Sequence, residues 1–201
     1  MQLALRGLRI LKNALICIEK GLSEPIWFGA ALRSDGVVVA TILPKGSREQ
    51  ALASLYVRLK NLNLRVTKHV SCHEVIEKLE KLFKGSEASL PFSLENVSGF
   101  ERDVLNVVRH VPRGFVTSYG EVAKAIGKPN ASRAVGRALS KNPLPLIIPC
   151  HRVVRNDLSL GGFESGIQLK KMLLEREGVK FKGHKVMEEH FLALSSLAYR
   201  F

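Results

Sequence analysis

The stretch SYGEVAKAIGKPNASRAVGRALSKN, residues 118–142, decides the fold of the second half of the chain. Ser118 and Glu121 form an S-x-x-E capping box, which predicts a helix that begins there and ends near Gly127. The turn Lys128-Pro129-Asn130 predicts the N-cap of a second helix. A helix, a short turn and another helix are typical of a helix-turn-helix. In the second helix, apolar residues recur at helical spacing and predict one buried face: Ala131, Ala134, Val135, Ala138 and Leu139.

The opposite face of this second helix combines basic residues with unusually small ones: Arg133, Gly136, Arg137 and Ser140. A glycine inside a helix costs about 1 kcal/mol relative to alanine. Gly136 therefore indicates that another backbone approaches closely, and the charge favours DNA. A solvated basic face with a tolerated glycine explains this helix, taken alone, equally well.

A candidate nucleophile follows directly, in the run NPLPLIIPCHRVV at residues 142–154. Cys150 adjoins His151 and Arg152, and a base or a positive charge favours the reactive thiolate. Adjacent side chains on an extended chain point to opposite faces, so His151 needs a bend or a bridging water to reach Cys150. The alternative is an inert, buried cysteine that packs as a small apolar residue.

The remaining segments predict an α/β (α+β) fold. Residues 26–43 contain two β-rich runs joined by Asp35-Gly36, which predicts a hairpin with Trp27 as a strand core residue. Residues 47–60 and 71–84 show helical periodicity, so residues 1–95 are expected to form a strand-rich module with helices. Helical patterns follow at residues 98–110 and from Ser165 to Gly178.

The charge of the chain favours an anionic partner. Its 201 residues are 46% hydrophobic, and 31 Lys and Arg against 18 Asp and Glu give a net charge of +13. Residues 109–155 hold nine basic residues and one acid, a net of +8, so the charge concentrates around the predicted helix-turn-helix. Nucleic acids and membrane surfaces both attract such a segment.

Neither a membrane span nor a removable signal is expected. Arg6, Arg9 and Lys12 interrupt the N-terminal apolar segment, and no apolar run approaches the ~20 residues of a membrane helix. The first 20 residues are basic, but they contain no uninterrupted apolar core and no clear cleavage site.

The three cysteines do not resemble a secreted disulfide framework, which favours a reducing cytosol. Cys17, His69, Cys72 and His73 are zinc-type ligands, but their spacing matches no zinc motif, so no metal is expected. The spacing of four residues between His69 and His73 places both at an ordinary helix start. Whether Cys17 and Cys72 pair with each other stays open.

The run IPCHRVV at residues 148–154 closely resembles the O6-alkylguanine-DNA alkyltransferases, also called methylated-DNA-protein-cysteine methyltransferases. The resemblance covers about residues 98–180 and includes GFVTSYGEVAKAIG, SRAVGRAL, SKNPLPLI, GGF and LLEREG. It implies a ribonuclease H-like α/β domain at residues 1–95 and a mostly helical alkyltransferase and DNA-binding domain at residues 96–182. Residues 183–201 form a C-terminal extension without a counterpart.

The resemblance also implies the roles of the candidate catalytic residues. Cys150 is the alkyl acceptor, His151 deprotonates it through a water, and Glu177 orients His151. Asn142 lies at the hinge between the recognition helix and the active-site loop. Tyr119 crowds the phosphate of the flipped nucleotide and hydrogen-bonds its base.

Further implications concern the partner. The substrate is double-stranded DNA containing O6-alkylguanine, or alkylated thymine, which is bound through the minor groove and repaired once without a cofactor. Arg133 enters the base stack where the damaged nucleotide leaves. The protein is expected to be a monomer in the cytoplasm, at the nucleoid in a prokaryote. The expected DNA-binding residues are Tyr119, Gly120, Arg133, Gly136, Arg137, Ser140 and Arg152.

Some positions admit a second interpretation. Glu177 stands in the last turn of a helix, where a carboxylate opposes the helix dipole by roughly 0.3–1 kcal/mol and needs a partner. An exposed ion pair with Arg176 or Lys180 is the alternative.

Tyr119 could be a partly buried helix-cap aromatic. Some relatives have Tyr at Phe163 and Ser at Glu164, which leaves the accepted size of the O6 substituent open.

Three rival functions use the same features differently. A non-enzymatic protein that binds alkylated lesions on the same fold is the main alternative, but in such proteins the acceptor cysteine is replaced. A cysteine hydrolase would require an oxyanion hole and has no use for a helix-turn-helix. A transcription factor would need no cysteine beside its recognition helix.

Overall fold

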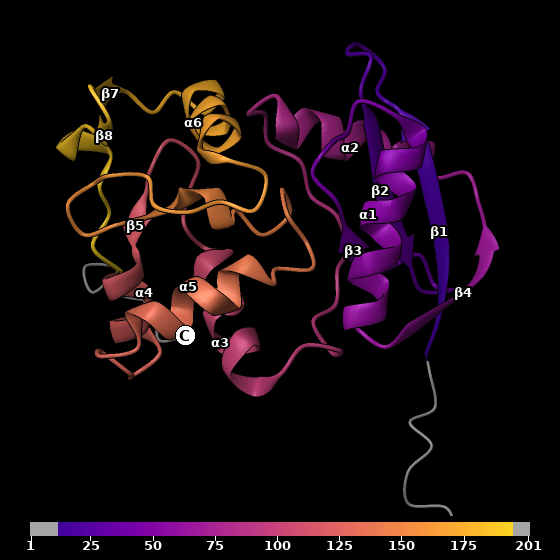
Figure 1. Ribbon diagram of the computed structural model, residues 1–201, viewed down its shortest axis with the longest axis horizontal. Helices are drawn as coiled ribbons and strands as arrows, with labels where there is room; N and C mark the ends of the chain where they lie inside the picture. Colours follow the sequence, from indigo (N-terminus) through magenta and orange to yellow (C-terminus); the bar gives the residue numbers. More distant parts are fainter. Residues whose placement is uncertain (1–11, 195–201) are drawn as a thin grey trace, which may run out of the picture.

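The computed structural model describes residues 12–194, which form two parts that lie side by side (Figure 1). The N-terminal part is built on a four-stranded sheet of order β3-β2-β1-β4. Strands β1 and β2 pair antiparallel, as do β2 and β3, whereas β4 runs parallel to β1. The strands are β1 (Lys12–Lys20), β2 (Trp27–Leu32), β3 (Val38–Thr41) and β4 (Leu64–His69).

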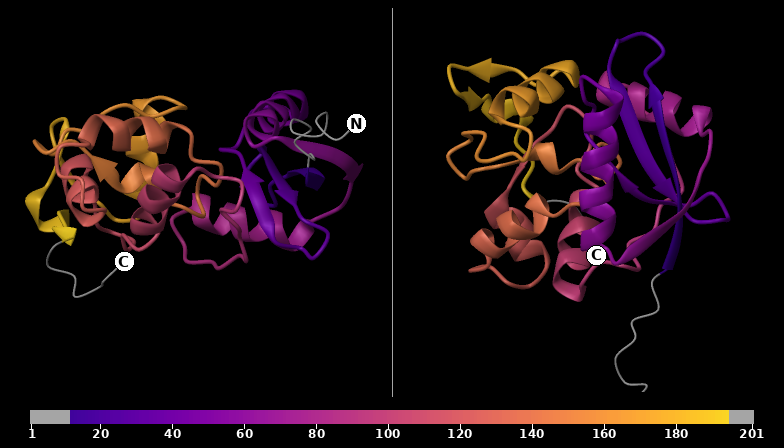
Figure 2. Two further views of the ribbon diagram at one scale, coloured as in Figure 1. Left: turned by 90° about the horizontal axis from the view of Figure 1, so that it is seen from below. Right: turned by 45° about the vertical axis from the view of Figure 1, so that its right-hand side comes forward.

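Two helices cover the two faces of this sheet (Figure 2). Helix α1 (Arg48–Asn61) packs Ala51, Leu55 and Leu59 onto one face. Helix α2 (His73–Phe83) packs on the other face, where the Phe83 ring meets Phe28 edge-on at 5.8 Å between ring centroids. The predicted hairpin and both predicted helices are therefore confirmed, and Trp27 begins β2 as a partly buried residue.

A disulfide joins Cys17 of β1 to Cys72, the N-cap residue of α2. The structure thus answers the question that the sequence left open for this pair, because the fold brings residues 55 positions apart to a Cα separation of 6.0 Å. The shared helix start for His69 and His73 is wrong, since His69 ends β4 and His73 begins α2. Residues 12–194 contain no cluster of three or more His, Cys, Asp or Glu side chains suited to a metal ion.

The C-terminal part is mostly helical around one apolar core. Helix α3 (Gly99–Val108) packs against α4 (Tyr119–Ala125) and α5 (Ser132–Ser140). The Ser118 hydroxyl accepts a hydrogen bond from the Glu121 amide at 3.1 Å, which confirms the predicted helix start. Asn130 is not the cap of α5, because the helix begins one residue later with Ala131 as its N-cap.

The segment after α5 and helix α6 complete this part. A 3-10 turn, η1 (Cys150–Arg152), leads into β6 (Val153–Val154), which pairs in parallel with β5 (Thr117–Ser118). Helix α6 (Ile167–Arg176) follows, with Glu177 as its C-cap residue, and the next residue, Gly178, has a positive φ of 91°.

The described part of the C-terminal extension packs on this half. It comprises β8 (Lys185–Val186), which pairs with β7 (Phe181–Lys182), and η2 (Glu188–His190). The Val116 amide donates to His190 O, and the Leu192 amide donates to Val116 O, both at 2.8 Å. The extension thus lies along the segment that leads into β5. Its last residues, and the N-terminal residues Arg6 and Arg9, lie outside the described range.

Contacts from β3 and α1 join the two parts. The Thr41 amide donates to Pro143 O, and its hydroxyl donates to Pro145 O, both at 2.8 Å. The Arg58 guanidinium of α1 donates to Asn142 O and to both carboxylate oxygens of Glu164, at 3.1 and 3.0 Å. The N-terminal part therefore holds the segment that precedes the candidate nucleophile. Within the described residues, every helix is too short or too polar to cross a membrane.

Candidate active site and nucleic-acid interface

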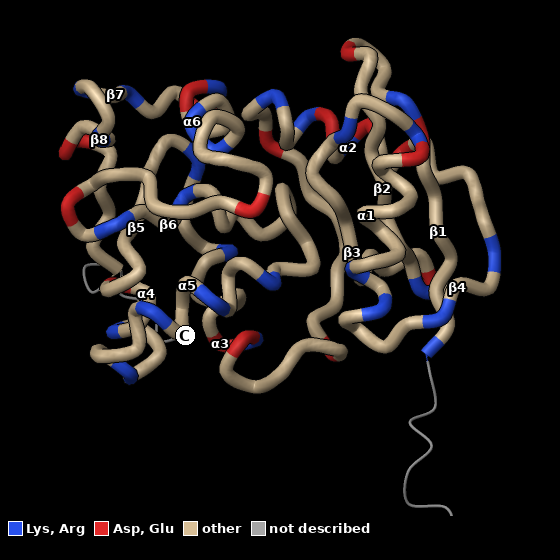
Figure 3. Tube along the Cα trace, in the orientation of Figure 1, with Lys and Arg blue, Asp and Glu red and all other residues tan. Residues whose placement is uncertain are grey.

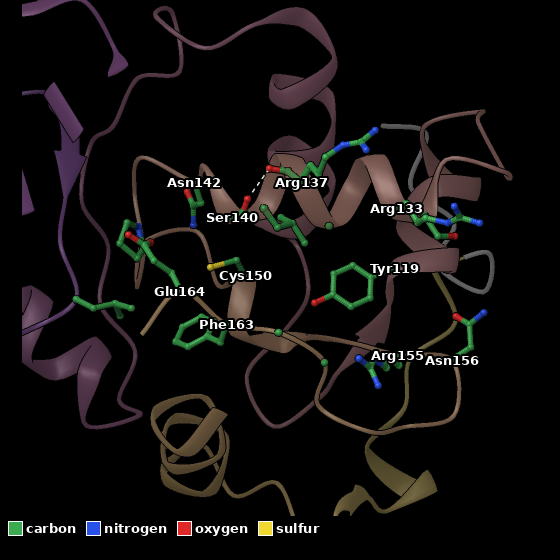
Figure 4. A pocket seen from close by; sticks show the side chains of 17 residues that line it. Tyr119, Arg133, Arg137, Ser140, Asn142, Cys150, Arg155, Asn156, Phe163 and Glu164 are labelled. Atoms are coloured by element: carbon green, nitrogen blue, oxygen red, sulfur yellow. Dashed lines mark hydrogen bonds between the residues drawn. The ribbon is translucent and has the colours of Figure 1, made fainter. Parts of the chain in front are cut away.

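A cavity of about 750 Å³ opens between α5, the start of α4 and the loop at residues 161–164 (Figure 4). A volume of this size suits a small organic molecule or a single nucleotide. Leu43 of the N-terminal part also lines the cavity. Candidate residues from three separate segments line it together: Tyr119, Arg133, Gly136, Arg137, Ser140, Asn142 and Cys150.

Cys150 begins the η1 turn, and its sulfur faces the cavity (Figure 4). The preceding loop is fixed by Asn142, which donates to Ile148 O at 2.9 Å and accepts from the Leu144 amide at 3.0 Å. Burial raises the pKa of the Cys150 thiol above its usual value, and a hydrogen bond from Asn142 and the positive charges of Lys170 and Arg58 offset only part of this rise. Asn142 therefore both shapes the loop and stabilises the thiolate.

His151 and Glu177 form a buried pair beside this turn. Nε2 of His151 lies 2.8 Å from Oε1 of Glu177. Arg152 donates to the same carboxylate from Nε and Nη2, at 2.9 and 2.8 Å. Burial alone would raise the pKa of Glu177, but the hydrogen bonds from His151 and Arg152 lower it to about 2. Glu177 is thus an ionised acceptor at neutral pH.

The expected alternative partners of Glu177 are engaged elsewhere. Arg176 pairs with Glu24 at 3.1 Å, and Lys180 pairs with Glu189 at 3.3 Å. The 3-10 turn supplies the bend that the sequence required, but it turns the His151 ring into the interior. No direct hydrogen bond between Cys150 and His151 occurs within the described residues. A proton between them would therefore travel through a water.

Tyr119, the first residue of α4, projects into the cavity from the side opposite Asn142 (Figure 4). Glycines give the ring its space: a Cβ built on Gly161 would lie 3.3 Å from the hydroxyl oxygen, and one on Gly136 would lie 3.7 Å from the ring. Burial raises the pKa of Tyr119, as does the charge of Cys150, while Arg155 opposes this rise. The phenol is therefore protonated at neutral pH and can donate a hydrogen bond.

The predicted small, basic face of α5 lies at the cavity mouth. Arg133 and Arg137 are exposed, and the Ser140 hydroxyl donates to Arg137 O at 2.8 Å. Gly136 is half-buried, and a Cβ built on it would meet the Tyr119 ring before any other side chain. Figure 3 shows that Lys and Arg follow α4, α5 and the turn between them. This face can attract a polyanion to the entrance of the cavity.

Two expected DNA-binding residues occupy other positions. Arg152 is largely buried against Glu177 and also donates to Val111 O at 2.7 Å, so its guanidinium is away from the α5 face. Gly120 is buried under Asn156, where an added Cβ would approach the side-chain oxygen to 2.9 Å. Both residues therefore contact other parts of the protein next to the cavity and do not belong to the exposed face of α5.

Comparison with known proteins identifies the family of the chain. The sequence model of the 6-O-methylguanine DNA methyltransferase DNA-binding domain matches residues 99–179. A methylated-DNA–protein-cysteine methyltransferase of Thermococcus kodakarensis is 34% identical over 160 residues, which cover 77% of this chain and 90% of that protein. The chain belongs to the methylated-DNA–protein-cysteine methyltransferase family.

Other members of this family extend the comparison. The Methanothermobacter thermautotrophicus protein is 41% identical over 113 residues, which span 55% of this chain and 63% of that protein. The crystal structure of the O6-methylguanine-DNA methyltransferase from Pyrococcus kodakaraensis has a TM-score of 0.65 at 31% identity, covering 82% of this chain and 99% of the other. The Mycobacterium tuberculosis protein in complex with DNA has a TM-score of 0.63 at 28% identity, covering 81% and 92%.

Against this family background, three side chains at the site were not anticipated from the sequence. Arg155 lines the cavity beside Tyr119, Arg58 reaches the loop from the N-terminal part, and Lys170 of α6 is fully buried behind Tyr119. Each resembles an ordinary surface cation in the sequence. Only the hydrophobic periodicity of α6 could have revealed Lys170, since Lys170 falls on the same helix face as Leu173 and Leu174.

Proposed function

We propose that this chain repairs O6-alkylguanine in double-stranded DNA by transferring the alkyl group, once and irreversibly, to Cys150. The observation that carries the proposal is that Cys150 opens into the cavity beneath the basic face of α5. A base inside a duplex cannot reach such a thiol, so the damaged nucleotide has to be flipped out of the stack. The cavity volume and the glycines around Tyr119 support this entry of a base.

The proton moves first in this reaction. Glu177 is ionised and accepts from Nε2–H of His151, which leaves Nδ1 of His151 as the basic atom. A water between Nδ1 and Cys150 then carries the thiol proton to His151, as a positioned general base requires. Burial lowers the pKa of His151, although Glu177 opposes this, so the imidazole starts in its neutral, accepting form.

The alkyl transfer is a displacement at carbon. The Cys150 thiolate forms the S–C bond while the bond from that carbon to O6 breaks, and the guanine leaves with the electron pair. The Tyr119 hydroxyl donates its proton to the departing guanine. A thioether is stable in water, so Cys150 is not regenerated and no cofactor takes part. Alkylated thymine presents the same kind of exocyclic oxygen and is a second substrate.

The DNA-binding arrangement follows from α4, the turn and α5, which we assign as a helix-turn-helix. Helix α5 enters the minor groove, and Arg133 fills the space that the flipped nucleotide leaves and pairs with the orphaned base. Arg137 and Ser140 contact the backbone near the cavity mouth. The lesion rather than the sequence around it is therefore selected.

The sheet order and its single parallel pair support assignment of residues 1–95 to the ribonuclease H-like class. Residues 96–182 form the alkyltransferase and DNA-binding domain, with residues 183–201 as an extension. We assign a monomer that acts in the cytoplasm, at the nucleoid in a prokaryote. The Cys17–Cys72 bridge is compatible with this location in hyperthermophiles, whose intracellular proteins are rich in disulfides.

Intact-mass spectrometry after incubation with an oligonucleotide that contains O6-methylguanine tests the proposal. One methyl group per protein is expected, and peptide mapping should place it on Cys150. Cys150→Ala should take up no methyl group while still binding the lesion. Repeated turnover would contradict the mechanism. Lesion binding without any transfer by the unmodified chain would instead favour the non-enzymatic lesion-binding protein.

A further inference from the structure

The C-terminal extension has no part in the proposed reaction. Its described residues, 183–194, follow the segment 99–179 that the family model matches, and none of them lines the cavity. In Figure 1 the yellow end of the chain nevertheless runs from β8 past β5, the strand that leads into Tyr119. The extension contacts two segments of the chain that continue into the cavity wall.

The first of these segments leads to Tyr119. The Val116 amide donates to His190 O, and the Leu192 amide donates to Val116 O, both at 2.8 Å. Strand β5 begins at the next residue, and α4 begins directly after β5 with Tyr119. These hydrogen bonds therefore hold the backbone from which the Tyr119 ring projects.

The His190 ring adds a side-chain contact to the same segment. Its Nε2 lies 3.0 Å from the amide of Lys180, which can only donate, so Nδ1 carries the proton of the neutral ring. Nδ1 then donates to Gly114 O at 2.8 Å. The ring is largely buried, and it ties the turn before β5 to the residue before β7.

The second segment is the loop at residues 155–161, part of which lines the cavity. The Val186 amide donates to Leu158 O at 3.0 Å, and Lys185 pairs antiparallel with Ser159. Leu158 has a φ of 64°, in the left-handed region that a residue with a Cβ adopts at a steric cost. The extension therefore supports a loop conformation that is unfavourable for leucine on its own.

Apolar packing joins the two segments behind the cavity. Val186 and Phe191 of the extension share one cluster with residues of both segments and of β6: Val116, Val154, Leu158 and Leu160. Leu160 directly precedes Gly161, which lines the cavity. A change in the extension is therefore transmitted to both segments.

The two segments meet at the Tyr119 ring and leave it little space (Figure 4). A Cβ built on Gly161 would lie 3.3 Å from the Tyr119 hydroxyl oxygen and 3.4 Å from Cγ of Arg155. A Cβ built on Gly120 would lie 2.9 Å from Oδ1 of Asn156. Because these contacts are close, the relative position of the two segments determines where the phenol points.

We propose that the C-terminal extension holds Tyr119 against the loop at residues 155–161, so that His190 and Leu192 are positioning residues for the alkyl transfer. The effect on transfer rests on the proposed function, but the placement of Tyr119 can be measured without DNA. Cys150 follows a loop that Asn142 fixes, so the extension should govern the phenol and leave the thiol unchanged. An extension that only covered apolar surface would change stability without moving Tyr119.

¹⁹F NMR of the protein labelled with 3-fluorotyrosine tests the placement, with Tyr119→Phe to assign the resonance. Leu192→Pro removes the amide that donates to Val116 O, and the extended backbone of Phe191 can precede a proline. The Tyr119 resonance should shift, whereas that of Tyr56 on the distant α1 should not. Leu192→Ala keeps the amide and should leave both in place. An unmoved Tyr119 resonance in folded Leu192→Pro would overturn the proposal.

A second pair of variants keeps the test open if Leu192→Pro fails to fold. His190→Ala loses the hydrogen bond to Gly114 O, whereas the side-chain amide of His190→Asn can still donate from the position of Nδ1. The Tyr119 resonance should shift in His190→Ala and return toward its original position in His190→Asn. A resonance that stays in place in His190→Ala would overturn the proposal.

Two reactions of Cys150 then separate positioning from a general loss of the site. Single-turnover transfer from free O6-benzylguanine should be on the order of 10- to 100-fold slower in Leu192→Pro than in Leu192→Ala, because it depends on where Tyr119 lies. Alkylation of Cys150 by iodoacetamide needs no tyrosine and should be equal in both. Equal losses in both reactions would overturn the proposal. If the unmodified protein transferred no alkyl group, the proposed function would fail, and the ¹⁹F spectra would still decide the placement of Tyr119.

Discussion

Nε2 of His151 lies 2.8 Å from Oε1 of Glu177, although 26 residues separate the two in the sequence. An ionised carboxylate can only accept, so His151 donates from Nε2 and keeps Nδ1 as an acceptor. Arg152 donates to the same carboxylate, which fixes Glu177 from a second direction. The pair thus sets both the tautomer and the orientation of the imidazole.

Removal of this pair should shift the pH dependence of single-turnover methyl transfer. His151→Ala lacks the proposed general base, so its rate at pH 7 should fall on the order of 10²-fold and recover partly as hydroxide ionises Cys150 directly. Glu177→Gln should show a milder shift in the same direction, because it loses orientation rather than the base. Circular dichroism defines the pH range in which each variant is folded. Identical pH profiles in all three proteins would remove both residues from thiolate formation.

The role of Arg133 can be separated from the chemistry by comparing two substrates. Arg133→Ala should slow repair of O6-methylguanine in a duplex on the order of 10- to 100-fold, because extrusion of the nucleotide costs a few kcal/mol. The reaction with free O6-benzylguanine needs no extrusion and should be nearly unchanged. Arg65→Ala, at an exposed position of β4, is a matched control that should change neither rate. Equal losses on both substrates would mean that Arg133 supports the fold or the transfer step.

Salt should weaken duplex binding steeply and with little regard to sequence. Nine basic residues lie between positions 109 and 155, and those that contact phosphates release counterions on binding. The logarithm of the binding constant should therefore fall linearly with the logarithm of the salt concentration. Arg137→Ala should reduce this slope by about one, as expected for the loss of a single phosphate contact. A slope near zero would show that this segment is not the DNA footprint.

The Cys17–Cys72 disulfide should affect stability and leave the reaction unchanged. A bridge between residues 55 positions apart restricts the unfolded chain and contributes on the order of 4 kcal/mol to the free energy of unfolding. Cys17→Ser should therefore lower the melting temperature, and added reductant should lower that of the unmodified protein but not that of the variant. Methyl transfer at a temperature where both are folded should be equal. If Cys17→Ser and the unmodified protein melted at the same temperature, the disulfide would contribute nothing to the free energy of unfolding.

Much of the fold could be predicted because local signals agree with it. The Asp35-Gly36 turn, the Ser118 capping box and the helical spacing of α5 each specify structure within a few residues. Strand β1 was missed because it is central and lies between β2 and β4, so it is apolar on both faces and shows no alternation. The pairing of Cys17 with Cys72 stayed open because sequence separation carries no information about distance in space.

In the candidate site too, residues within a sequence motif could be predicted, whereas residues that the fold brings in from elsewhere could not. Residues within a motif, such as Cys150 and His151, could be found from their neighbours in the sequence. Arg152 could not be assigned to a buried pair, because its position beside Glu177 depends on how α6 docks on η1. Arg58 and Lys170 reach the site from distant parts of the sequence, and a single lysine or arginine on a helix looks the same in the sequence whether its charge is solvated or buried.

The contact of Arg58 with Asn142 O and Glu164 carries a consequence for the history of the protein. A helix of the N-terminal part holds both ends of the loop that carries Cys150, although the family's DNA-binding model begins only at residue 99. A change of charge at this contact in one half is therefore expected to require a matching change in the other half. Across an alignment of relatives, positions 58 and 164 are expected to covary in charge, and a chimera that joins halves from distant relatives should fail unless this pair is transplanted together.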